Sequence, residues 1–214
     1  MTTNKITATL TNAGKRFNRE WIFRKLNHEF ISGNAYAITG SNGSGKSTLL
    51  QCIAASMNLN EGSLKIQTVS AAGIKDIATD DIHQQLAICA PYLELVEEMT
   101  AIEFLTFHQQ FKPLMQAVSI PEIIAIIGLE KATNKQIRHY SSGMKQRIKL
   151  AQAVFSDTPV LLLDEPCTNL DLDGYRLYHQ LITSYCHQKM VIICSNEEAE
   201  IDFCTERLNI VDYK

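Results

Sequence analysis

The sequence predicts an α/β protein: a mostly parallel sheet flanked by helices, with a small antiparallel β layer and a helical subdomain. Two observations support the sheet. Strand-like runs alternate with helix-like runs, and several later strand-like runs are apolar at nearly every position. Such runs are typical of strands buried on both faces of a parallel sheet, and the alternation is typical of α/β folds. A third observation, the lack of any clear strand between about residues 98 and 140, predicts the helical subdomain.

The strand-like runs fall into an early and a later group. ITATL (6–10) and LNHEF (26–30) come first, and we expect the part up to about Phe30 to form the antiparallel layer. The later runs are AYAIT (35–39), SLKIQ (63–67), QLAIC (85–89), VLLLD (160–164), MVIIC (190–194) and RLNIV (207–211).

Helix-like runs lie between these strands. They are Lys46–Ser56, Gly143–Phe155, Gly174–His187 and Glu197–Phe203. In the strand-free middle, Thr100–Phe111 places its apolar residues on one helical face. Pro121 is suited to begin another helix and Gly128 to end it. We therefore expect one domain over 1–214, with the β layer and α/β core in 1–90 and 157–214 and a helical subdomain in about 91–156.

The composition excludes several classes of protein. The chain has 214 residues, 45% of them hydrophobic and 20% charged, which is ordinary for a globular domain. Its net charge of -3 argues against a nucleic-acid partner. No stretch approaches the roughly 18 apolar residues of a membrane span. The six cysteines form no C-x-x-C pair, so we expect free thiols and no zinc site.

A glycine-rich segment, AYAITGSNGSGKSTLL, follows one predicted strand and begins one predicted helix. It contains G-x-x-x-x-G-K-S, in which backbone N–H groups and the helix N-terminus surround phosphate groups. We expect Lys46 to reach the β- and γ-phosphates and Ser47 to ligate Mg²⁺. The predicted ATP-binding residues of this loop are Gly40, Ser41, Asn42, Gly43, Ser44, Gly45, Lys46, Ser47 and Thr48.

Two carboxylates follow the buried run VLLLD. Asp164 ends that run, so its side chain should emerge near the loop and hold Mg²⁺ directly or through water. Glu165 comes next, and a carboxylate directed at the γ-phosphate can polarise the attacking water. A solvated glutamate before a proline is the alternative, and the neighbouring motifs favour catalysis.

Three classes of phosphate-loop protein fit these motifs: a small-molecule kinase, a GTPase and a cassette ATPase. A GTPase should carry the guanine-reading N-K-x-D, which is missing from the sequence. A kinase lid should carry clustered arginines, whereas the middle region has only Arg138 before YSSGM. A second phosphate-type helix start, YSSGMKQR, therefore decides between them.

With this segment the chain resembles the ATP-binding subunit of an ABC transporter over essentially its whole length. The family signature L-S-G-G-Q aligns with YSSGM, residues 140–144, where Ser replaces Gly and Met replaces Gln. The resemblance implies a RecA-like core and two subunits that enclose two ATP molecules, each between one P-loop and the other chain's signature. It assigns this contact in trans to Ser141, Ser142, Gly143 and Met144.

The resemblance extends to further positions. TNLD (168–171) is similar to the D-loop, in which Asp171 would touch the opposite subunit. Phe17 stands where the family places an aromatic residue that stacks on adenine, although a core role for Phe17 and stacking by Trp21 are alternatives. The helical region would dock on a membrane subunit.

Two positions depart from the family pattern. Where the family has the Q-loop glutamine, this chain has Pro91 or Tyr92. Where the family has the switch histidine, this chain has Asn196, whose amide can donate to phosphate but cannot become charged. We expect slow hydrolysis that depends on Glu165.

The resemblance implies an ATPase, working with Mg²⁺ and ATP, that powers a separate membrane-spanning transporter. An exporter is favoured by the signature and the compact size. The expected partners are an identical or homologous ATP-binding subunit and a transmembrane permease, with the chain on the cytoplasmic face of the membrane. The alternative is a nucleotide-dependent dimerising switch with very slow hydrolysis. A cassette protein acting on DNA or ribosomes is disfavoured, because such relatives usually carry long inserts or two cassettes.

Overall fold

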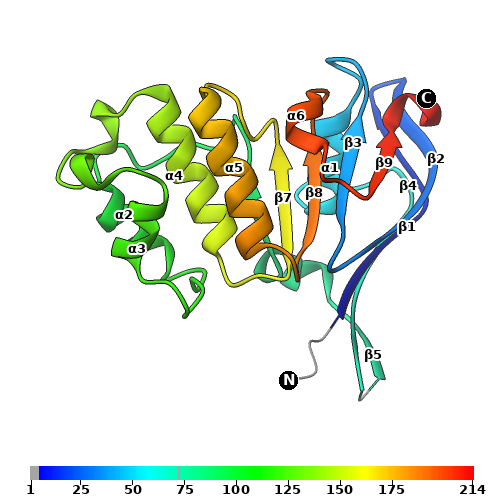
Figure 1. The fold of residues 1–214 in the computed structure, drawn as a ribbon. Coiled ribbons are helices and arrows are strands. Elements are labelled where there is room, and N and C mark those ends of the chain that lie inside the picture. The colour runs from blue at the N-terminus through cyan, green and yellow to red at the C-terminus, as the bar shows by residue number, and fades with distance from the viewer. Residues whose placement is uncertain (1–4, 72) are drawn as a thin grey trace.

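The computed structural model describes residues 5–71 and 73–214 and places them in two sheets flanked by helices. Five strands form a parallel sheet in the order β6-β7-β8-β3-β9, and four form an antiparallel sheet in the order β2-β1-β4-β5. The helices α2, α3 and α4 lie on the opposite side of the parallel sheet from the antiparallel strands (Figure 1). The predicted α/β class, with its second β layer and its helical part, is confirmed.

The parallel sheet is buried on both faces, which explains its continuous apolar runs. Leu161 and Leu163 pack into the core shared with the helical part, whereas Val160 and Leu162 pack into the core shared with the antiparallel sheet. The strands are β3 (Ala35–Thr39), β6 (Leu86–Cys89), β7 (Val160–Asp164), β8 (Met190–Cys194) and β9 (Glu206–Asn209).

The antiparallel sheet extends beyond residue 30, the limit expected from the sequence. The run around SLKIQ pairs with the first strand, with Leu10 opposite Leu64. The strand β5 (Gly73–Asp76) has no counterpart among the predicted runs. All four of its residues are exposed, so its sequence shows no apolar alternation. The strands are β1 (Lys5–Phe17), β2 (Glu20–Ile31), β4 (Glu61–Ser70) and β5 (Gly73–Asp76).

Side-chain caps set several helix boundaries. Asp171 accepts a hydrogen bond from the Gly174 N–H at 2.8 Å, so α5 begins before Gly174, the predicted start. Asn209 accepts from the Val211 N–H at 3.2 Å and starts a 3₁₀ turn, which ends the last strand before Ile210. The α-helices are α1 (Lys46–Ile53), α2 (Ala101–His108), α3 (Ile120–Ile126), α4 (Ser142–Phe155), α5 (Leu172–Tyr185) and α6 (Glu198–Ile201). The 3₁₀ segments are η1 (Thr79–Gln84), η2 (Glu130–Ala132), η3 (Ile137–His139) and η4 (Ile210–Tyr213).

The two short helices of the middle region both begin with a capping box. Thr100 and Glu103 exchange side-chain and backbone hydrogen bonds at the start of α2, and Ser119 and Glu122 do the same at the start of α3. Each box satisfies backbone N–H groups that a helix start leaves free. In the described part of the chain, no helix is long and apolar enough to cross a membrane. All six cysteines are free thiols.

Candidate functional site

The P-loop joins β3 to α1 and lines a cavity of about 340 Å³. The turn requires glycine at its end, because Gly45 has a φ of 109° and a Cβ there would lie 2.2 Å from Ile22 Cγ2. The cavity therefore lies against the start of α1. Its lining residues are Phe17, Ile22, Asn42, Gly43, Gly45, Lys46, Ser47, Thr48 and Glu165.

Lys46 is folded back onto its own loop. Its ammonium donates to the Gly40 carbonyl at 2.7 Å and lies 3.4 Å from the Ser41 carbonyl. The residue is buried. The Lys46 ammonium is thus held by backbone carbonyl groups of the loop. Phosphate oxygens can replace these carbonyls as acceptors.

Asp164 emerges from the end of β7 beside the P-loop, as its position after the apolar run predicts. Burial raises the pKa of its carboxyl, while a hydrogen bond from Ser47 and the Lys46 charge lower it. The nearby Glu165 also raises this pKa. A serine hydroxyl and a neighbouring carboxylate are oxygen ligands of the kind Mg²⁺ prefers, and phosphate oxygens would complete the set. These two residues fit the ion that the sequence predicts.

Glu165 occupies a strained backbone position at the cavity wall. Its φ is 45°, in the left-handed region that non-glycine residues rarely adopt. Its N–H donates to the Cys194 carbonyl of β8 at 2.9 Å, and its carbonyl accepts from the Thr168 hydroxyl at 2.9 Å. The turn after β7 thereby directs this exposed carboxylate into the same cavity as Lys46 and Ser47.

Asn196, at the switch position, contacts the P-loop. Its Oδ1 accepts from the Gly40 N–H at 3.0 Å, and its Nδ2 lies 3.5 Å from Asn42 Oδ1. The neutral amide therefore joins the segment after β8 to the phosphate loop.

The two Q-loop candidates differ in what they contact. Pro91 accepts a hydrogen bond from Lys149 through its carbonyl at 3.2 Å. Burial raises the pKa of the Tyr92 hydroxyl, a hydrogen bond with Gln51 opposes this, and the Asp164 charge adds to it. Tyr92 is therefore the candidate that lies near Asp164.

The two aromatic candidates for adenine stacking are also separated by their surroundings. Phe17 is 47% exposed and lines the P-loop cavity. The Trp21 ring is contacted by guanidinium groups, with Arg24 Cζ at 4.5 Å and Arg16 Cζ at 5.5 Å from its centroid. Phe17 is therefore not a core residue, and its ring is accessible to a ligand in the P-loop cavity.

The signature residues lie at the start of α4 and line a different cavity, of about 410 Å³. Ser141 caps the helix, accepting from the Met144 N–H at 3.3 Å. A Cβ on Gly143 would lie 3.1 Å from the Asn169 carbonyl, so the first turn of α4 packs closely on the D-loop. The lining residues are Gly128, Leu129, Lys131, Ala132, Ser141, Ser142, Gly143, Met144, Arg147, Asn169, Leu170 and Asp171.

A third cavity, of about 540 Å³, lies between these two cavities. It shares Asn42 and Glu165 with the P-loop cavity and Asn169 and Leu170 with the signature cavity. Within one chain the signature and the P-loop therefore face separate spaces, with the D-loop between them.

Sequence reasoning missed several residues of this region. Ile22 closes the P-loop turn, and Glu200 accepts from the Cys167 N–H at 2.8 Å behind the turn that carries Glu165. Burial raises the pKa of Glu200. The glutamate-rich segment after MVIIC was the available signal for Glu200. Ile22 has no local signal, because its contact with Gly45 joins distant parts of the chain.

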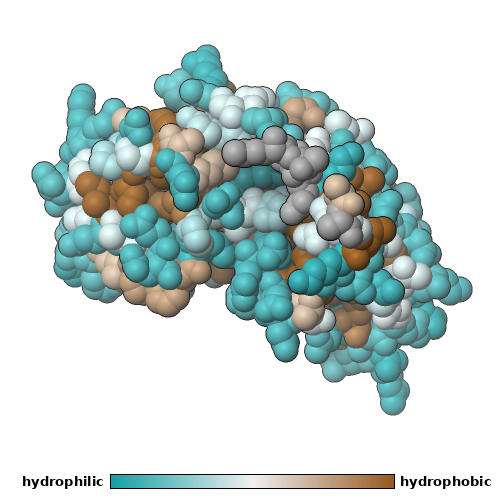
Figure 2. All heavy atoms as spheres, turned by 90° about the horizontal axis from the view of Figure 1, so that it is seen from below, coloured by the Kyte–Doolittle hydropathy of each residue, from teal (hydrophilic) through white to brown (hydrophobic). Residues whose placement is uncertain are grey.

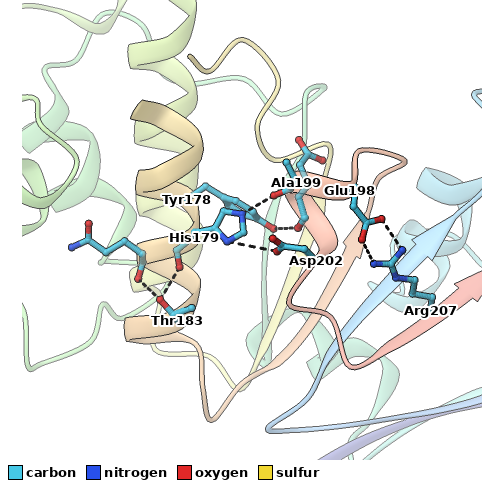
Figure 3. A network of polar contacts seen from close by, with 9 residues as sticks. Tyr178, His179, Thr183, Glu198, Ala199, Asp202 and Arg207 are labelled. Carbon is cyan, nitrogen blue, oxygen red and sulfur yellow. Dashed lines mark hydrogen bonds and ion pairs between the residues drawn. The ribbon is translucent and has the colours of Figure 1, made fainter. Parts of the chain in front are cut away.

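Contacts with α5 and β9 hold α6, the helix that carries Glu200, in place (Figure 3). The Tyr178 hydroxyl donates to the Glu200 carbonyl at 2.9 Å, and His179 Nε2 donates to the Ala199 carbonyl at 2.6 Å. Arg207 of β9 binds both carboxylate oxygens of Glu198. These contacts fix a helix of only four residues, and so they fix the position of Glu200.

Comparison with known proteins places this arrangement in a family. Residues 23–168 match the family model described as ABC transporter. The chain is 28% identical to the Bacillus subtilis ABC transporter ATP-binding protein YybJ, over 88% of this chain and 84% of that protein. It is 29% identical to the cytochrome c biogenesis ATP-binding export protein CcmA of Agrobacterium fabrum, over 89% of this chain and 88% of that protein. It is also 26% identical to the methionine import ATP-binding protein MetN of Clostridioides difficile, over 76% of this chain and 52% of that protein.

Solved structures share the fold. An ATP-binding subunit of an ABC transporter superposes with a TM-score of 0.81 at 20% identity, over 95% of this chain and 85% of that one. The dimeric ABC transporter cassette MJ0796 superposes with a TM-score of 0.74 at 21% identity, over 95% of this chain and 94% of that one. ABC cassettes are generally Mg²⁺-dependent ATPases that dimerise and work with membrane permease subunits. The chain belongs to the ABC transporter ATP-binding family.

Proposed function

We propose that this chain hydrolyses ATP and powers a separate membrane-spanning transporter, with export as the direction. The observation that carries the proposal is the cavity that Lys46 and Ser47 of the phosphate loop line together with Glu165. The export relative CcmA supports the direction, although the chain also has the import relative MetN.

The residues divide the chemistry between them. Gly40 to Thr48 bind the phosphates through backbone N–H groups and the Lys46 ammonium, which exchanges the Gly40 carbonyl for phosphate oxygens. Bound with ATP, Mg²⁺ supplies charge neutralisation at the phosphate oxygens, and Ser47 and Asp164 would hold it. Glu165 orients and polarises the attacking water. Phe17 stacks on the adenine.

We further propose that two chains complete each site. Ser141, Ser142, Gly143 and Met144 of one chain would face the γ-phosphate held by the other, with Asp171 touching the partner. The separation of the signature and P-loop cavities within one chain supports this arrangement. The Ser141 cap and the start of α4 would then offer N–H groups and positive potential to the partner's ATP.

The permease partner is proposed to dock on the helical subdomain, which we place at about residues 91–156. Exposed apolar side chains support this: Phe107 and Phe111 form a T-shaped pair 5.0 Å apart and are 44% and 75% exposed. Seen from below, apolar side chains gather on the lobe that holds the helical part (Figure 2). Through this partner the chain would work at the cytoplasmic face of the membrane.

A nucleotide-dependent dimerising switch is the second candidate. Asn196 bonds the Gly40 N–H through a side chain that cannot carry a charge, and the Q-loop glutamine is replaced by Pro91 or Tyr92. Slow hydrolysis would let an ATP-bound dimer persist.

Two measurements test these functions. A tagged chain, recovered from native membranes in mild detergent, should bring a multi-span membrane protein in stoichiometric yield, identified by mass spectrometry. That complex should release phosphate from ATP, and Glu165→Gln should lower the rate roughly 10²- to 10⁴-fold. Recovery without a membrane partner, together with a stable ATP-bound dimer and negligible turnover, would support the switch. Phosphate release that Glu165→Gln leaves unchanged would refute the assigned base.

A further inference from the structure

We propose that Gln146, on the signature helix α4, is a positioning residue for Glu165. This inference rests on the proposed function, because it assumes that Glu165 acts on the attacking water. Gln146 does not line the P-loop cavity, so its effect must pass through the turn that follows β7.

Gln146 binds the backbone carbonyl of Pro166, the residue that follows Glu165. Its Nε2 donates to the Pro166 carbonyl at 2.7 Å and lies 3.8 Å from the Cys89 Sγ. Gln146 is only 5% exposed, so solvent cannot readily replace this hydrogen bond. Proline has no N–H, so this carbonyl is the only backbone hydrogen-bonding group that Pro166 offers.

The turn that receives this hydrogen bond needs external support. Glu165 has a φ of 45°, and such a conformation persists only where the surroundings hold it. Thr168 and Cys194 bond the two sides of Glu165, and Glu200 accepts from the Cys167 N–H. Gln146 adds a contact from a different element, the helix that begins at the signature.

Two further contacts join α4 to the same loop. Gly143 lies so close to the Asn169 carbonyl that a Cβ would be 3.1 Å away, and Arg147 Nη2 is 3.5 Å from the Asp171 carboxylate. The signature helix α4 thus contacts both the beginning and the end of the loop that follows Glu165. A shift of α4, such as one produced when the signature meets the partner's ATP, would reach Glu165 through Pro166.

The test compares kcat and ATP affinity in the wild-type chain, Gln146→Met and Gln152→Met, each with and without Glu165→Gln. Methionine keeps the length of glutamine and removes the donor. Gln152 is the matched control, because it lies on the same helix and its Nε2 bonds His108 Nδ1 at 3.2 Å, away from the turn. Gln146→Asn keeps the amide but shortens its reach, and it replaces Gln146→Met if that variant unfolds below the assay temperature.

We expect Gln146→Met to lower kcat roughly 10- to 100-fold, because a small misplacement of a reacting group has effects of that size. The Kd for ATP should change less than about twofold, and Gln152→Met should retain the wild-type kcat within the same margin. In the Glu165→Gln background, Gln146→Met should change the residual rate less than about twofold, since both residues act in one step.

Wild-type kcat in Gln146→Met, or an equal loss of kcat in both backgrounds, would overturn the inference while leaving the proposed function intact. The ATP hydrolysis rates of the wild-type chain and of Glu165→Gln are compared first. If the rate does not depend on Glu165, the proposed function fails and this inference fails with it.

Discussion

The Lys46 ammonium lies 2.7 Å from the Gly40 carbonyl oxygen, so the cation that we propose binds phosphate is already bonded within its own loop. ATP must take over that hydrogen bond. Lys46→Ala should weaken ATP binding by about 2–5 kcal/mol, the range for removing one partner of a buried charge contact. Isothermal titration of the purified chain measures this, and circular dichroism should show an intact fold. Equal Kd values for the two proteins would contradict the role of Lys46.

Phe17 and Trp21 form a matched pair for adenine binding. Phe17→Ala should weaken ATP binding by about 1–3 kcal/mol, the usual range for stacking of a base on an aromatic side chain. Trp21→Ala should leave the Kd unchanged within about twofold, because Trp21 does not line the P-loop cavity. The same titration distinguishes them, and the reverse order of effects would assign the stacking to Trp21.

Alanine substitutions at Ser141 and Ser142 distinguish the loss of a helix cap from the loss of any serine hydroxyl. Ser141→Ala removes the acceptor of the Met144 N–H and should lower the free energy of unfolding by about 0.5–2 kcal/mol. Ser142→Ala, inside the first turn, should change it by no more than about 0.5 kcal/mol. Urea unfolding of the nucleotide-free chain measures both. If the trans arrangement holds, Ser141→Ala should also weaken the ATP-dependent dimer in analytical ultracentrifugation.

The exposed pair Phe107 and Phe111 on the helical part should determine binding of the membrane partner. Replacing Phe107 and Phe111 by serine removes exposed apolar surface and should lower recovery of the membrane partner several-fold. Ile74→Ser is the control, because Ile74 is 67% exposed on β5 of the other layer. Mass spectrometry of the co-purified material gives the stoichiometry, and a loss of equal size in the control would remove the assignment to this surface.

His108 should make the stability of the helical part depend on pH. Its Nδ1 accepts from Gln152 and its Nε2 contacts the Ser156 hydroxyl at 3.0 Å, an arrangement that suits a neutral imidazole. Burial, with a smaller effect of the Lys112 charge, lowers the pKa of His108 from 6.5 to about 4. As the pH falls below 6.5 the unfolded chain binds a proton first, so this stability is complete above pH 6.5 and is lost towards pH 4.

The loss from His108 should amount to about 1–3 kcal/mol by pH 4, reduced from the full linkage value because the ring is only partly buried. His108→Gln should show a smaller fall in the free energy of unfolding between pH 7 and pH 4. Denaturant titrations at each pH measure it. Parallel curves for the two proteins would show that His108 does not titrate between these limits.

The sequence by itself determined the class of fold and the chemistry of the phosphate loop. A run such as VLLLD has apolar side chains on both faces, which specifies a strand covered on both sides wherever it lies. The G-x-x-x-x-G-K-S spacing likewise encodes a local conformation, because the turn depends on glycines a few residues apart. Signals of this kind are readable because every residue involved is close in the chain.

Only the tertiary structure decided between residues that look alike in sequence. Phe17 and Trp21 are both aromatics of the antiparallel sheet, and of the two Phe17 lines the P-loop cavity. Gln146 and Gln152 share one helix, yet only Gln146 reaches Pro166, 20 residues further along. Glu200 bonds the Cys167 N–H across 33 residues. The physical reason is that these contacts join separate elements, and their partners are set by packing of the two sheets and the helices rather than by local conformation.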